Sequence, residues 1–266
     1  MGYSIDNFLE NNDVRKLDQK GAFTVIEWER DLSVLPHNAM LAYYCDEMNV
    51  RKRQVVVDLS KSAVITQAGA MQWMVGNVES NTGIKGGMDL AKKMVRGAAS
   101  GESAIKPEYK GDGTLVLEPT YRHIILMNMA DWNGSVVLDD GLFLACDAHL
   151  KHKIVARSNF SSAIAGGEGL FNLGIEGDGI LAIESPCPPE ELVEIVLDND
   201  VVKIDGNMAL AWSGNLQFTV ERSGKSLIGS AASGEGLVNV YRGTGRVLMA
   251  PVREPSGAML HGGFPS

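Results

Sequence analysis

Three glutamates that recur at nearly constant spacing are the residues of this sequence with the clearest chemical potential. Glu102, Glu168 and Glu235 are separated by 66 and then 67 positions, and each follows a glycine. Three equivalent carboxylates could together hold a cation or a polar ligand. The structural alternative is that each glutamate accepts backbone N–H groups at a strand entrance, or pairs with a basic residue of the next unit. The pattern favours the structural role, and the three glutamates are the candidate binding residues.

Other motifs that could do chemistry fail on closer inspection. The stretch RSGKS at Arg222–Ser226 resembles the end of a phosphate-binding loop, but Thr219 stands where the loop requires a glycine. His149 and His152 are three positions apart, so on a strand they point to opposite faces and do not form a metal site. The sequence therefore predicts no catalytic residue, no metal and no cofactor.

The cysteines indicate a reducing compartment. Cys45, Cys146 and Cys187 are odd in number and widely spaced, without the C-x-x-C pair of a zinc or redox site. None has a basic neighbour in the sequence that would favour a thiolate nucleophile. The first residues lack the pattern of a secretion signal, and no apolar run has the ~20 residues that a spanning helix needs. We expect a cytoplasmic protein.

The net charge of the chain disfavours two classes of partner, nucleic acids and anionic membranes. The 24 basic and 33 acidic residues give a net charge of -9, which repels phosphate backbones and anionic membrane surfaces. The one dense basic cluster, Arg51–Arg53, is more typical of a solvated strand end. RNA binding is accordingly the less favoured interpretation.

The elements around the glutamates repeat with them. After each glutamate an alternating strand runs into a Gly-x-Gly, a second strand follows, and a proline ends it at Pro119, Pro186 or Pro251. The Gly-x-Gly predicts a hairpin turn because glycine tolerates positive φ. Upstream, each copy has a further strand, glycine turn and strand, around Gly69, Gly141 and Gly206.

This pattern predicts an all-β fold with short helical segments, in which three tandem lobes share a pseudo-threefold arrangement. The repeats span approximately residues 55–120, 121–187 and 188–252, within a single body of residues 1–266. Residues 1–54 are expected to add strands (AFTVIEWER and RQVVVDLS) and a short helix (SIDNFLENN). Residues 253–266 are rich in proline and glycine and are expected to form a mobile tail.

The repeated motifs resemble one known family. The combination of QAGAM at Gln67–Met71, SGES at Ser100–Ser103, GGEGLF at Gly166–Phe171 and SGEGLV followed by GTGRV is similar to the altered-inheritance-of-mitochondria family, numbered 24 in yeast. The resemblance implies β-sandwich lobes like those of the tryptophan RNA-binding attenuation protein, repeated in one chain and often assembled further. It implies no catalytic residues.

Two hypotheses about function follow. The first is a non-enzymatic cytoplasmic protein that assembles into a homo-oligomer, which would hide its sheet edges. The second is a small-ligand binding protein with sites in clefts between lobes, by analogy of fold. No nucleophile, acid–base pair or metal cluster supports an enzyme.

Overall fold

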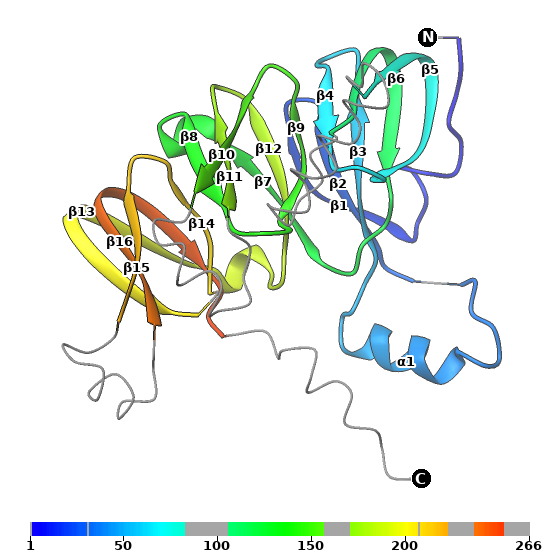
Figure 1. Cartoon of the computed structure of the whole chain (residues 1–266). Coiled ribbons are helices and arrows are strands. Elements are labelled where there is room, and N and C mark those ends of the chain that lie inside the picture. Colours follow the sequence, from blue (N-terminus) through cyan, green and yellow to red (C-terminus); the bar gives the residue numbers. More distant parts are fainter. Residues whose placement is uncertain are drawn as a thin grey trace, which may run out of the picture.

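The structure is a computed structural model that describes residues 2–30, 32–82, 106–156, 171–206, 208–222 and 237–252. In Figure 1 strands β1–β6 lie at the right, β7–β12 in the middle and β13–β16 at the left, and the short helix α1 (Ala39–Glu47) lies below the first group, apart from the sheets. Within the described ranges, no helix is both long and apolar enough to span a bilayer.

The described strands form two antiparallel sheets. The nine-stranded sheet has the order β1-β2-β3-β6-β4-β9-β12-β7, with β5 paired to β6. The seven-stranded sheet has the order β10-β11-β8-β14-β16-β13, with β15 paired to β16. The first sheet comprises β1 (Val14–Lys20), β2 (Phe23–Trp28), β3 (Arg53–Asp58), β4 (Val64–Thr66), β5 (Met71–Asn81), β6 (Glu108–Leu117), β7 (His123–Asn128), β9 (Phe143–Asp147) and β12 (Ile180–Ser185).

The second sheet comprises β8 (Ser135–Leu138), β10 (Lys151–Ala156), β11 (Phe171–Glu176), β13 (Val193–Asp205), β14 (Ala209–Ser213), β15 (Gln217–Arg222) and β16 (Leu237–Met249). Two 3-10 turns, η1 (Met129–Trp132) and η2 (Pro189–Glu191), complete the described elements. The predicted all-β class is confirmed.

Buried side chains gather in successive clusters along the chain. One cluster centres on Phe23 and Leu115, a second on Phe143 and Leu181, and a third on Trp212, which packs against neighbouring aromatic rings. These clusters form because alternate residues of each strand point inward. The division into three equivalent lobes stays a prediction.

The three upstream glycine turns are confirmed. Gly69, Gly141 and Gly206 each lie between two strands, with φ of 79°, 72° and 64°. This left-handed backbone is open to glycine at little cost, which explains why the same residue recurs.

The predicted hairpin at each Gly-x-Gly is wrong. Strands β6 and β16 continue without interruption across their Gly-x-Gly. Strands β11 and β12, which flank the middle copy, lie in different sheets. The first glycine has nearly the same φ in all three copies, namely 131° at Gly111, 126° at Gly177 and 123° at Gly243. The motif is a bend that turns the chain from one set of strand partners to another.

Steric contact explains the need for glycine at this bend. A Cβ added to Gly111 would lie 2.0 Å from the backbone oxygen of Asn77 on β5. Before the bend β6 pairs with β4 through Tyr109, and after it with β3 from Thr114 onward. The missing side chain therefore allows the one long strand β6 to pair with β4 on one side of the bend and with β3 on the other.

The proline stops are confirmed, because β6, β12 and β16 end at Leu117, Ser185 and Met249, one or two residues before each proline. Strands were also correctly predicted in AFTVIEWER and RQVVVDLS. The helix predicted for residues 4–12 is wrong: these residues form turns, and Phe8 packs its ring against Trp28 and Trp73. The described helix is instead α1, at residues 39–47.

Several predictions lie outside the described residues. They are the weakly helical segments before each glutamate (88–100, 158–167 and 224–233), residues 223–226 of the RSGKS motif, and the tail at 253–266.

Candidate interaction surface

The three candidate glutamates, Glu102, Glu168 and Glu235, also lie outside the described residues. Their proposed roles stay predictions. The described part of the chain offers a different candidate, which is the connection between β2 and β3. It comprises residues 29–52 and is called the arm below.

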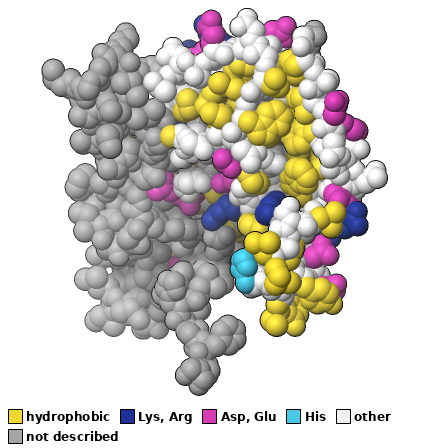
Figure 2. All heavy atoms as spheres, turned by 90° about the vertical axis from the view of Figure 1, so that its right-hand side faces the viewer, with side chains coloured by type: hydrophobic (Ala, Val, Ile, Leu, Met, Phe, Trp, Pro, Cys, Tyr) yellow, Lys and Arg dark blue, Asp and Glu magenta, His cyan; other side chains and the backbone are white. Residues whose placement is uncertain are grey.

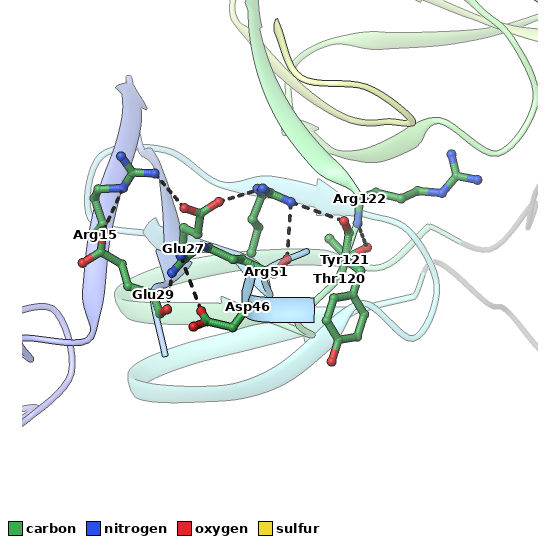
Figure 3. A network of polar contacts seen from close by, with 9 residues as sticks. Arg15, Glu27, Glu29, Asp46, Arg51, Thr120, Tyr121 and Arg122 are labelled. Atoms are coloured by element: carbon green, nitrogen blue, oxygen red, sulfur yellow. Dashed lines mark hydrogen bonds and ion pairs between the residues drawn. The ribbon is translucent and has the colours of Figure 1, made fainter. Parts of the chain in front are cut away.

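A buried ion pair forms the base of the arm. Arg53, the first residue of β3, places its Nη2 2.7 Å from Oε2 of Glu27 on β2, and both side chains are almost fully buried. Arg15 of β1 reaches the other carboxylate oxygen of Glu27, also at 2.7 Å (Figure 3). The sheet register places these residues together, because Glu27 lies opposite Arg53 in one pair of strands and opposite Arg15 in the other.

Arg53 also reaches toward the next group of strands. Its Nη1 donates to the backbone oxygens of Arg51 and Tyr121, both at 3.3 Å, and Tyr121 lies in the segment that leads into β7. Its Nε is buried without a hydrogen-bond partner. Such a buried guanidinium depends on Glu27, since an unpaired charge in the interior is strongly unfavourable.

Both ends of the arm are held close together. The N–H of Trp28 donates to the oxygen of Lys52 at 2.9 Å, and Arg51 donates to the backbone oxygen of Glu29. Arg51 also lies 3.5 Å from Asp46 of α1 (Figure 3). The arm therefore leaves the sheet and returns at one point, which the ion pair stabilises.

The arm exposes apolar side chains to solvent. None of the nine residues of α1 is buried. Met40 is 74% exposed, Tyr44 60% and Met48 73%. The other exposed large apolar side chains of the arm are Leu32, Leu35, Leu41, Tyr43 and Val50. In Figure 2 hydrophobic side chains dominate the surface at the height of α1.

A second apolar area lies on the same side of the molecule, at the height of β5 in Figure 2. Met71 and Met74 of β5 are 37% and 40% exposed, less than the residues of α1. Trp73 is partly covered by Phe8. The apolar residues of β5 are therefore partly covered by the chain's own N-terminal segment, whereas those of the arm are not packed into any described core cluster.

The described cysteines include one pair with histidine that the linear sequence conceals. The Sγ of Cys146 lies 3.3 Å from Nε2 of His152, with Lys106 close enough to influence both. The prediction from the sequence concerned local basic partners that would activate the thiol; the fold adds a contact with His152 of β10. Burial nevertheless raises the pKa of the Cys146 thiol to about 12 and lowers the pKa of His152 to about 4. These directions keep both groups neutral, which is the opposite of an activated nucleophile.

His149 and His152 contact different parts of the chain. The ring of His149 contacts the backbone oxygen of Asp178 at 2.6 Å, whereas His152 contacts Cys146. Among the residues that the structure describes, no three His, Cys, Asp or Glu side chains form a group suited to a metal ion.

Sequence reasoning missed α1 as a functional element. The signal was present in MLAYY, where five apolar residues lie within a connection that no strand pattern claims. Their exposure could not be read from the sequence, because an apolar run of this length is equally typical of a buried element.

The comparisons with known proteins agree with the sequence pattern. The model of a family described as mitochondrial biogenesis AIM24 matches residues 48–252. An uncharacterized protein of Streptococcus pyogenes serotype M6 is 32% identical over 202 residues, covering 73% of this chain and 79% of that protein. A crystal structure of a Streptococcus pyogenes protein has a TM-score of 0.57 at 25% identity, covering 90% of this chain and 94% of the other. The family match begins at the residue after α1 ends.

Proposed function

This chain belongs to the mitochondrial biogenesis AIM24 family, and we propose that it is a non-enzymatic protein that acts by assembling with copies of itself. The observation that carries the proposal is the exposed apolar arm. The surface of a soluble chain rarely keeps several large apolar side chains together unless they meet a partner.

The energetics of α1 support this proposal. A helix of nine residues is too short to be stable in water by itself, because nucleation is costly and few hydrogen bonds follow it. Helices of this length are normally stabilised by packing an apolar face. None of the residues of α1 is buried against the described body, so a second surface would supply the missing packing.

Other features of the described residues fit a non-enzymatic role. The Cys146–His152 pair is held neutral by burial. The buried charges at the base of the arm, Glu27 and Arg53, are paired with each other. The net charge of -9 also disfavours a nucleic-acid partner.

The test is the molar mass of the full chain in solution over a range of concentrations, measured by size-exclusion chromatography with light scattering. We expect a concentration-dependent rise from monomer toward dimer or a larger closed assembly. A strictly monomeric species up to about 100 μM, a concentration that detects even weak association of about 5 kcal/mol, would overturn the proposal.

A variant without most of the arm tests whether the arm is responsible for self-assembly. Replacing residues 30–50 by a two-residue Asn-Gly turn joins β2 to β3 directly, which the facing pair Trp28 and Lys52 allows. We expect this variant to keep the β-sheet signal of the parent in circular dichroism, to lose the small helical contribution of α1, and to be monomeric. Retained assembly would show that the arm does not carry it.

A further inference from the structure

We propose that two copies of this chain pair through α1, with the two helices antiparallel and a two-fold axis passing close to Tyr44. This inference rests on the proposed self-assembly, and it names the surface and geometry that perform it. The partner is therefore a second copy of this chain.

The apolar residues of α1 have the spacing that such a pair requires. Met40 and Tyr44 of α1 and its C-cap residue Met48 are four positions apart and lie along one side of the helix, with Leu41 beside them. All of them are well exposed. An antiparallel pair centred on Tyr44 brings Met40 next to Met48 of the partner subunit, and each tyrosine against its symmetry mate.

The charges of α1 are placed the wrong way round for a single helix. Asp46 and Glu47 lie in the last turn, next to the negative end of the helix dipole, and α1 itself has no acidic residue in its first turn and no basic residue in its last turn. The nearby cation is Arg51, which lies beyond the helix at 3.5 Å from Asp46. The N-cap residue Asn38 makes no capping bond, because its side-chain oxygen accepts the N–H of Leu35 at 2.8 Å. In one isolated copy the N-terminal end of the helix therefore lacks a capping bond, whereas the C-terminal oxygens of Tyr44, Cys45 and Asp46 accept backbone N–H groups of residues 48–50.

Antiparallel pairing would balance the uncapped first turn of one helix with the acidic last turn of the other. It brings Glu47 of the partner subunit beside the first turn of α1, where helical N–H groups are unpaired and the dipole is positive. The two-fold axis repeats this contact at the other end. A parallel pair would instead place the acidic residues of both copies side by side, which is repulsive.

The exposed apolar area of the whole arm is close to that of a stable interface. Eight large apolar side chains of the arm are between 43% and 74% exposed. At about 150 Å² for a large side chain, this corresponds to roughly 750 Å² per copy, of which the α1 face contributes about half. A standard stable interface takes about 800 Å² from each partner, so the pair also requires apolar residues of the arm beyond that face.

Lipid is the less suitable partner for α1. Helices that lie on membrane surfaces carry lysine and arginine on their polar face, which attract anionic headgroups. The polar residues of α1 are Asp46 and Glu47, and the helix contains no lysine or arginine. Its charge is repelled by the surface that would have to bind it.

The first experiment places a charge on the axis. Tyr44→Glu sets two like charges against each other across the pair, and we expect the dissociation constant, measured by sedimentation equilibrium, to rise at least tenfold. The matched control is Met74→Glu on β5, which adds the same charge to the same side of the molecule and should leave the constant unchanged. Dissociation by Met74→Glu and not by Tyr44→Glu would overturn the inference.

The second experiment tests the direction of the helices. Glu47→Lys improves the charge at the end of an isolated α1, so the helix content of a single copy should not fall. In the antiparallel pair the same change places a cation at the positive end of the partner's helix, and association should weaken at least fivefold. Glu47→Gln should fall between the two. Association unchanged or strengthened by Glu47→Lys would exclude the antiparallel arrangement.

The outcomes separate this inference from the proposed function. A wild-type chain that stays monomeric would remove both. An assembly that persists in Tyr44→Glu would remove the α1 pair and leave self-assembly in place. The third outcome concerns vesicles that contain phosphatidylglycerol. If the monomeric wild-type chain cosediments with them and Tyr44→Glu does not, α1 binds a lipid surface and the inference is overturned.

Discussion

At the scale of the residue, Arg53 and Glu27 illustrate a buried charge that is tolerated through its partner. The guanidinium groups of Arg53 and Arg15 both contact the carboxylate of Glu27 at the base of the arm. The pair is costly to desolvate, so its presence does not by itself imply a large stabilisation. Removing one member of the pair is strongly destabilising, because the charge of the other member then stays buried without its partner.

We expect Arg53→Met to destabilise the protein by about 3–5 kcal/mol, since Glu27 would lose its buried partner. The measurement is the free energy of unfolding in urea. Arg246→Met is the matched control: Arg246 pairs with Glu194 at 2.8 Å, but both side chains are more than 40% exposed. This exposed pair should contribute about 1 kcal/mol or less. Equal losses for the two variants would contradict the assigned role of burial.

His152 predicts how stability depends on pH. Burial first, and then the charge of Lys106, lowers the pKa of His152 to about 4. In the unfolded chain the histidine pKa is about 6.5. The unfolded state therefore binds a proton more readily as the pH falls below about 6.5, and stability decreases until the folded histidine also titrates near pH 4. Between pH 7 and pH 5 this loss is about 2 kcal/mol.

His152→Gln removes that titration and should reduce the loss of unfolding free energy between pH 7 and pH 5. The pKa of His123 is also lowered, by burial and then by Arg53, so the variant retains a smaller slope of the same sign. Urea unfolding at the two pH values measures the difference. A variant with the full slope of the wild type would show that His152 is not the group responsible.

At the scale of the element, the Gly-x-Gly bends explain how long strands reach two sets of neighbours. The sequence motif was read as a turn, yet the chain stays extended at two of the three copies. The physical reason is that glycine permits both a reversal and a bend in extended backbone, and only the surrounding strands select one of them.

Gly111→Ala is expected to destabilise the protein by roughly 3–5 kcal/mol, because the new Cβ meets the Asn77 oxygen and the φ of 131° is unfavourable for alanine. Gly69→Ala provides the comparison. Its φ of 79° is also positive, but nothing lies within 4 Å of the added Cβ. We expect a loss of about 1 kcal/mol there. Thermal or urea unfolding distinguishes the two, and a smaller loss at Gly111 would contradict the steric explanation.

At the scale of the whole molecule, the arm is an addition to a body that does not depend on it. The sheets and core clusters contain no side chain from α1. The arm leaves and returns between Trp28 and Lys52, which face each other. Folding of the body and presentation of the arm are therefore separable.

The variant with residues 30–50 replaced by Asn-Gly should consequently be as stable as the parent at a concentration where both are monomeric. A shorter connection lowers the entropy cost of closing the loop, by up to about 2 kcal/mol. Differential scanning calorimetry measures this as an unchanged or raised Tm. A Tm lowered by more than about 5 °C, equivalent to roughly 1–2 kcal/mol for a chain of this size, would show that the arm supports the body.

The sequence by itself determined the β class, the strand boundaries at each proline and the glycine turns at Gly69, Gly141 and Gly206. These features are local, because alternation, a missing proline N–H and a positive φ each act within a few residues. The cytoplasmic location, the three-lobe division and a ligand site between lobes stay predictions, as does any role of the three glutamates.

The tertiary structure alone decided which strands pair across the Gly-x-Gly bends, that Cys146 meets His152, and that Glu27 is buried against Arg53. It also decided that the apolar residues of α1 face solvent. Each of these depends on how segments are placed in space, whether they are six residues apart, as Cys146 and His152 are, or 26, as Glu27 and Arg53 are. Local patterns specify which backbone a segment can adopt, whereas burial and pairing depend on what the rest of the chain places beside it.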